Sequence, residues 1–183
     1  MTTEQQQQQQ QQPDADILAS LQRRYAESPD PRDARTDRER DERATYRHRL
    51  QHLSGSFGGK CAELQHLEEK RAPFVAGLER NRDAETRLLS LLTDQPNDPQ
   101  ITAALDKLRR DSSNALPKPL RELMTDRCDS CGHEEINWPG SIDYLEYEVS
   151  RRDEQIADIQ RQLGVLRRAA TELLARESEP VTA

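Results

Sequence analysis

Hydrophobic residues recur every three or four positions along most of the chain, a spacing that predicts amphipathic helices. The clearest pattern follows Ser141, a suitable helix N-cap, with Asp143 in the first turn where a carboxylate suits the helix dipole. Five heptads then carry apolar residues at nine of ten a and d positions: Ile142, Leu145, Val149, Arg152, Ile156, Ile159, Leu163, Leu166, Ala170 and Leu173. We therefore expect a long coiled-coil helix over 141–177, with a neighbouring helix covering its apolar stripe.

Shorter helical patterns precede this one. Asp98 and Pro99 form a cap and first turn, and apolar residues at 101, 104, 105 and 108 form a stripe. We expect short helices and a two-cysteine knuckle over 94–140. Residues 41–93 are predicted as helix–loop–helix because the glycine-rich segment 54–60 interrupts them, and Pro73 either kinks the second helix or starts another.

The first 40 residues are predicted to be a disordered arm, since they are rich in glutamine and charge. A short amphipathic helix is expected near 15–26, capped by Asp14 and with four apolar residues on one face: Ile17, Leu18, Leu21 and Tyr25. That helix either folds back on its own body or docks into a partner's groove. Residues 178–183 form a tail. No segment alternates with period two, so the expected fold is all-α, an elongated antiparallel helical hairpin or coiled coil.

Two arrangements can cover the apolar stripe. Within the chain, the segment from Phe74 to Leu92 can lie antiparallel to the long helix, with Glu85 beside Arg152 as a charged layer that fixes the register. Between chains, an antiparallel dimer brings Glu146 of one copy to Arg167 of the other. Both can coexist when hairpins pair into a four-helix bundle. We favour self-association into a dimer or higher oligomer.

Composition supports thin helical seams rather than a thick globule, with 33% hydrophobic residues, 4% aromatic residues and a mean hydropathy of −1.04. The net charge is −7, and the arginines of 31–49 alternate with acids, so nucleic-acid binding is the less favoured reading. No apolar run is long enough to suggest a membrane span. The absence of secretory features at the start and the odd count of three cysteines favour a cytoplasmic location.

Cys128 and Cys131, followed by Gly132, have the spacing at which a tight turn directs two thiolates at one ion. His133 is a third candidate ligand, and we expect a structural Zn²⁺ site. Such a site needs four ligands, so the last comes from Glu134, water, a second chain, or one of four other residues: Cys61, His48, His52 and His66. In the register above, Cys61 lies too far from the knuckle. Unligated loop cysteines and a redox pair are the alternatives.

A Cys-x-x-Cys-Gly knuckle at 128–132, between helical arms, is similar to the zinc hook of SMC-like double-strand-break repair ATPases. The resemblance covers about 127–150 and implies that two knuckles share one ion across a dimer. Asp129 and Ser130 stand where the hook usually has a proline, and the chain has no phosphate-loop motif. The resemblance therefore extends to the clamp and not to the ATPase or its role on DNA.

Together these patterns predict a non-enzymatic, oligomeric coiled-coil adaptor or scaffold with a structural zinc knuckle and an unidentified protein partner. The alternative is a nucleic-acid-associated regulator that uses the knuckle and the arginine-rich helix, including Arg43, Arg47 and Arg49. An enzyme is not expected, because no Ser-His-Asp set, phosphate loop or carboxylate pair at a glycine-rich turn is recognisable.

Overall fold

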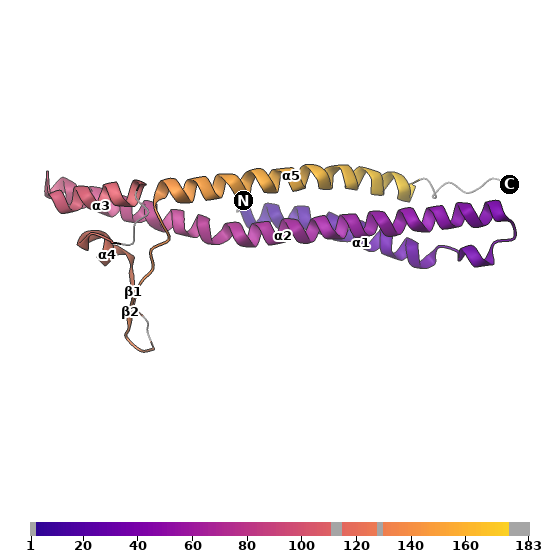
Figure 1. Ribbon diagram of the computed structural model, residues 1–183, viewed down its shortest axis with the longest axis horizontal. Coiled ribbons are helices and arrows are strands. Elements are labelled where there is room, and N and C mark those ends of the chain that lie inside the picture. The colour runs from indigo at the N-terminus through magenta and orange to yellow at the C-terminus, as the bar shows by residue number, and fades with distance from the viewer. Residues whose placement is uncertain (1–2, 111–114, 128–129, 176–183) are drawn as a thin grey trace. The chain divides into compact units, whose positions relative to one another are not determined.

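The computed structural model describes residues 3–110, 115–127 and 130–175, and it is mostly helical (Figure 1). The described residues form helices α1 (Thr3–Glu27), α2 (Asp37–Asp94), α3 (Pro99–Arg110), α4 (Lys118–Met124) and α5 (Ile142–Ala175), the 3-10 helix η1 (Pro31–Asp33), and strands β1 (Thr125–Arg127) and β2 (Glu134–Ile136). The predicted all-α class is confirmed at this level. None of the helices in the described part of the chain has an apolar stretch that could cross a membrane.

Two compact units share the long helices. Unit 1 contains Met1–His66 and Ile156–Ala183, and unit 2 contains Leu67–Gln155. Helices α2 and α5 therefore contribute one part to each unit.

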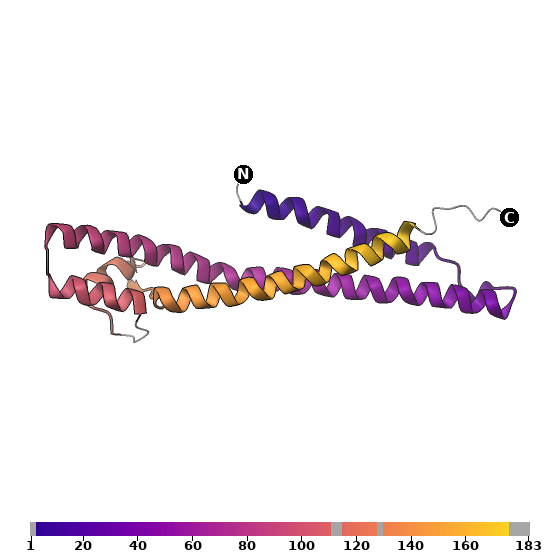
Figure 2. The ribbon, with the colours of Figure 1, turned by 90° about the horizontal axis from the view of Figure 1, so that it is seen from above.

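Unit 1 packs α1 against the first part of α2 and the last part of α5 (Figure 2). Its core is centred on Leu21, Leu50 and Ala170, one from each helix and all fully buried. Phe57 and Leu163 are also fully buried. Burying side chains of this size stabilises the unit by about 1.5–3 kcal/mol each.

Helix α1 is longer than predicted. It begins at Thr3, so Asp14 lies inside the helix rather than at its cap. From Asp14 onward α1 packs against the α2 and α5 parts of unit 1, because its apolar residues face the core and the Asp14 carboxylate pairs with Arg167 of α5. Disorder of the glutamine-rich residues stays a prediction, and the 178–183 tail lies outside the described residues.

The predicted break at 54–60 is wrong, and so is the helix–loop–helix assignment of 41–93: α2 continues from Asp37 to Asp94. An interior glycine weakens a helix by about 1 kcal/mol relative to alanine. Burial of Phe57 within this segment and of Leu50 just before it offsets that loss. Pro73 is also inside α2 and does not end it.

Unit 2 places α3 and α4 beside the last part of α2 (Figure 1). Asp98 caps α3 through its Oδ1, which accepts from the backbone N–H of Gln100 at 2.7 Å, as predicted. The predicted α3 stripe is buried and joins a core made of Ala84, Leu88, Ile101, Ala104, Leu105, Leu108, Leu116, Leu120, Met124 and Ile142.

The apolar stripe predicted for α5 lies on the side of the helix that is covered by other parts of the chain. All ten a and d positions are buried or half-buried in the chain. Ser141 caps the helix, its Oγ accepting from the Tyr144 N–H at 3.3 Å. In unit 2, the Arg71–Asp153 and Arg82–Glu146 ion pairs show that α2 and α5 run in opposite directions.

The predicted register of these helices is wrong. Glu85 accepts a hydrogen bond from Arg109 Nε of α3 at 2.6 Å, because α3 covers α2 at this point. Arg152 instead lies over the ring of Phe74, 3.8 Å from its centroid, and pairs with Glu148. Phe74 precedes Glu85 by eleven residues, so the prediction missed by about three helical turns.

The charges predicted to join two chains are used within one chain. Glu146 pairs with Arg82 at 2.7 Å in unit 2, and Arg167 pairs with Asp14 at 2.5 Å in unit 1. A Glu146–Arg167 contact between copies would have to compete with these two pairs, and it stays a prediction, as does self-association.

Candidate metal knuckle and arginine-rich helix

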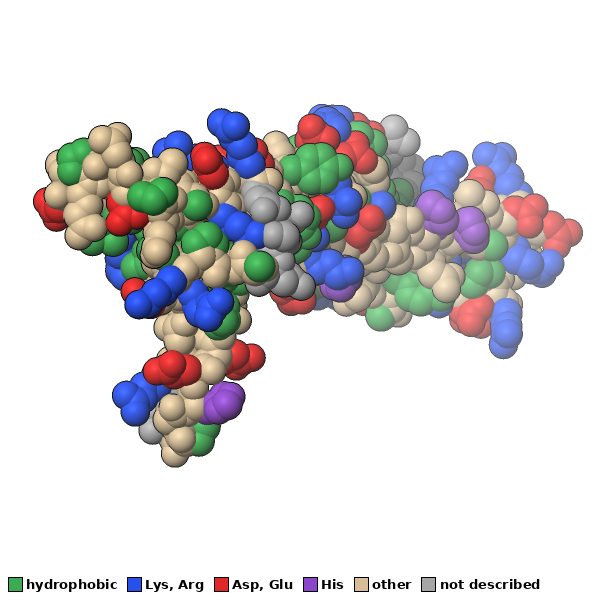
Figure 3. All heavy atoms as spheres, turned by 60° about the vertical axis from the view of Figure 1, so that its left-hand side comes forward, with side chains coloured by type: hydrophobic (Ala, Val, Ile, Leu, Met, Phe, Trp, Pro, Cys, Tyr) green, Lys and Arg blue, Asp and Glu red, His purple; other side chains and the backbone are tan. Residues whose placement is uncertain are grey.

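The predicted knuckle is the loop of a short hairpin in unit 2 (Figure 1). Strands β1 and β2 pair antiparallel, with Thr125 opposite Ile136 and Arg127 opposite Glu134. Side chains of both charges lie on this projecting hairpin, and Ile136 is 48% exposed (Figure 3). A two-stranded hairpin of this length has little stability of its own in water. Its loop therefore benefits from any additional cross-link.

The base of the hairpin is fixed to α2 by two adjacent residues of that helix. Arg80 Nη1 donates to Asp126 Oδ2 of β1 at 3.3 Å, and the fully buried Asn81 donates its Nδ2–H to the Gly140 carbonyl at 2.6 Å. Trp138, which follows β2, is half-buried and packs against the core of unit 2. The base of the hairpin is thus held while its loop points into solvent.

The loop places two of the three predicted zinc ligands on the surface. Cys131 and His133 are both exposed, whereas Cys128 lies outside the described residues. Gly132 between them has φ +69°, in the left-handed region that glycine adopts without strain. The glycine after the second cysteine therefore serves the turn as predicted. The guanidinium of Arg127 lies beside it, 3.8 Å from where a Cβ at Gly132 would be.

Glu134 begins β2 in unit 2, whereas the four more distant ligand candidates are in unit 1. His48 and His52 stack on each other along α2 with ring centroids 6.3 Å apart, and Cys61 lies further along the same helix, ahead of His66. Among the described residues, no three His, Cys, Asp or Glu side chains are grouped closely enough to hold a metal ion. Because Cys128 is outside that set, the zinc site stays a prediction.

No protein-family model, curated protein sequence or solved structure matches this chain. The chemistry of its own side chains is therefore the basis for assigning a function.

Two of the three arginines considered for nucleic-acid binding hold the segment between α1 and α2. Arg43 Nη1 donates to the Asp30 carbonyl at 3.2 Å, and Arg47 Nη1 donates to the Ser28 carbonyl at 2.7 Å. The Arg47 guanidinium also lies 4.6 Å from the centroid of the Tyr25 ring. Arg49 is exposed. Arg43 and Arg47 are thus engaged within the chain.

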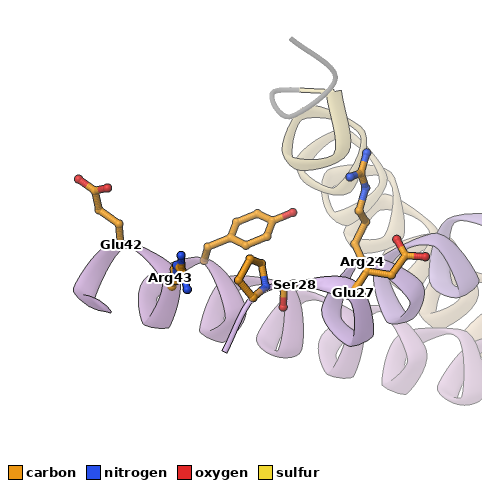
Figure 4. Close-up of a pocket in the computed structure, with 7 residues that line it drawn as sticks. Arg24, Glu27, Ser28, Glu42 and Arg43 are labelled. Atoms are coloured by element: carbon orange, nitrogen blue, oxygen red, sulfur yellow. The ribbon is translucent and has the colours of Figure 1, made fainter. Parts of the chain in front are cut away.

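An open pocket of about 410 Å³ lies where α1 ends and α2 begins (Figure 4). Arg24 and Glu27 of α1 and Glu42 and Arg43 of α2 contribute equal numbers of positive and negative charges to its lining. A phosphate-binding surface is normally rich in positive charge. This pocket therefore does not strengthen the nucleic-acid alternative.

One polar cluster has no counterpart in the sequence-based prediction. Arg167 donates from Nε and Nη2 to the two Asp14 oxygens at 2.5 and 2.6 Å, which joins α5 to α1. This hydrogen bond raises the pKa of Arg167, and burial raises the pKa of the neighbouring Cys61 thiol, with a further contribution from Asp14. The two partners are so far apart in sequence that no local pattern indicates the pairing. The Asp14–Arg167 pair therefore anchors α1 to α5.

Proposed function

We propose that this protein is a non-enzymatic adaptor or scaffold that self-associates and carries a structural Zn²⁺ site in its β1–β2 hairpin. Its helical framework is an antiparallel coiled coil of α2 and α5 in this proposal. The support comes from the length of these helices, 58 and 34 residues, and from the covered apolar stripe of α5. Long helices with a narrow apolar contact offer extended surface for other proteins.

The proposed zinc ligands are Cys128, Cys131 and His133, with Glu134, water or a second chain completing the site. The observation that carries this assignment is the left-handed Gly132 directly after Cys131, in a hairpin loop whose base is held by Arg80 and Asn81. A bound ion would join the two ends of the loop and stabilise a hairpin that is too short to be stable alone.

The nucleic-acid alternative has less support, because Arg43 and Arg47 already bind the α1–α2 segment and the net charge is −7. A nucleic-acid-binding protein that neutralises several phosphates loses affinity steeply as salt increases. Measured binding to DNA or RNA with that salt dependence would favour the alternative over the adaptor.

The zinc site is tested by metal analysis of the purified full chain and of a Cys128→Ser, Cys131→Ser variant. We expect zinc in the wild type and no zinc in this variant. The β1–β2 pairing should also be lost at a lower temperature in the variant than in the wild type. Cys61→Ser is the matched control, because this cysteine lies in unit 1, and it should keep the metal. Equal zinc content in all three proteins would contradict the assigned ligands.

A further inference from the structure

An open groove of about 620 Å³ lies between α2 and α5 in unit 1. Residues of α2 and α5 line it, among them Gly55, Gly59, Lys60, Glu63, Val165 and Leu166. Val165 is 57% exposed although it is an aliphatic residue in the interior of a long helix. The groove therefore combines a protruding apolar side chain on α5 with a glycine-lined notch on α2.

Among the described residues, no close packing requires a glycine at either of the two groove positions. A Cβ added at Gly55 or Gly59 would have no atom within 4 Å, whereas one at Gly77 would meet the Pro139 Cβ at 2.9 Å. Glycine weakens the interior of a helix unless a close contact offsets the loss. At Gly77 that contact is the packing against Pro139. At Gly55 and Gly59 the open helix face allows another backbone or side chain to approach closely.

The patch has the two features that a contact between two copies needs. A contact across a two-fold axis uses the same patch on both molecules, so the patch must offer both a protrusion and a place to receive it. Here the protrusion is the exposed Val165, and the receiving surface is the open helix face at Gly55 and Gly59.

The charge of the groove fits the same occupant. A net charge of −7 gives two copies of the chain a net electrostatic repulsion. The charged side chains of the groove, Lys60 and Glu63, form an ion pair at 2.7 Å and sum to zero. Two copies can therefore meet at this patch without net repulsion, with a residue of each sign on both sides. The patch has no net charge that would attract a strongly acidic or basic partner.

We infer that this groove is the contact between two copies of the chain, with each Val165 packed into the partner's Gly55–Gly59 notch. The inference rests on the self-association in the proposed function and names the surface responsible for it. None of the described residues that line the groove is a cysteine, so assembly here can be measured in the metal-free protein.

The test is sedimentation equilibrium of the full chain over a wide range of concentration, with and without zinc. Val165→Arg places a charge at the centre of the contact and should raise the dimer dissociation constant at least about tenfold. Leu91→Arg is the matched control, since Leu91 is a 43% exposed aliphatic residue of α2 in unit 2. Its dissociation constant should stay within about twofold of the wild type.

A second pair of variants separates loss of contact from loss of folding. Gly59→Leu fills the notch, and Gly164→Leu fills an equally open position on α5 outside the groove lining. Leucine favours a helix over glycine, so both variants should keep the wild-type helix content by circular dichroism. Only Gly59→Leu should weaken the dimer, again by about tenfold or more.

Two results would overturn the inference in distinguishable ways. A wild-type dimer whose dissociation constant is unchanged in Val165→Arg and Gly59→Leu would place the contact elsewhere and leave self-association intact. A wild-type chain that stays monomeric at every concentration would remove self-association from the proposed function as well.

Discussion

Asp14 and Arg167 form a two-point ion pair across 153 residues of sequence, with hydrogen bonds of 2.5 and 2.6 Å. The Asp14 side chain is only 10% exposed, so loss of Arg167 leaves a nearly buried carboxylate without its partner. We expect Arg167→Ala to destabilise the docking of α1 by about 1–3 kcal/mol. Hydrogen exchange of the α1 amides measures this directly. The exposed neighbour Arg168 gives the control, and equal effects of the two alanine variants would contradict an anchoring role.

The Glu148–Arg152 pair predicts a dependence of stability on pH. The hydrogen bond from Arg152 lowers the pKa of Glu148 in the folded chain. This pair therefore contributes stability above the ordinary carboxylate pKa, and the contribution is lost as pH falls through the lowered folded value. We expect Glu148→Gln to reduce stability near neutral pH and to make the loss of stability on acidification less steep. Urea unfolding across the acid range provides the measurement, with the exposed Glu154→Gln as a control that should show neither change.

The same substitution should have opposite effects at two helical glycines. Gly164→Ala adds a methyl group where no atom lies within 4 Å, so we expect stabilisation by about 0.5–1 kcal/mol through helix propensity. Gly77→Ala places its Cβ 2.9 Å from the Pro139 Cβ and must displace the segment that follows β2. We expect destabilisation by about 1–3 kcal/mol. Thermal melts give the melting temperature of each variant relative to the wild type. A shift of the same sign in both variants would contradict this packing.

The register of α2 and α5 in unit 2 is open to a cross-linking test. With the native cysteines replaced by serine, the pair Arg82→Cys and Glu146→Cys should join through a short bifunctional reagent, because their native side chains meet at 2.7 Å. The pair Glu85→Cys and Arg152→Cys tests the predicted register and should not join. Preferential cross-linking of this second pair would restore the register expected from the sequence.

Local features of the fold could be predicted from the sequence. Asp98 and Ser141 are caps because their side chains reach backbone N–H groups two or three residues away, and the stripes of α3 and α5 follow from periodicity alone. Features that depend on distant partners could not. Their spacing in the sequence predicted that Glu85 and Arg152 form a polar layer. In the structure, Glu85 pairs with Arg109 of α3, and the Arg152 guanidinium packs on the ring of Phe74. Gly55 and Gly59 indicated a break that burial of Phe57 prevents.

The candidate site was predictable in a similar, partial way. The Cys-x-x-Cys-Gly spacing indicated a turn with a permissive glycine, and Gly132 adopts the left-handed conformation. The flanking strands could not be foreseen, because three residues on each side are too few to show alternation. The anchoring of the hairpin by Arg80 and Asn81 also depends on contacts between segments far apart in sequence.

Native mass spectrometry of the chain tests self-association and zinc binding together, because one mass reports both the number of chains and the number of bound zinc ions. We expect a complex of two or more chains that carries zinc, with one ion per chain for separate sites or one per two chains for a shared clamp. A single chain without zinc, purified under metal-sparing conditions and sprayed at concentrations where assembly is expected, would contradict the proposed function.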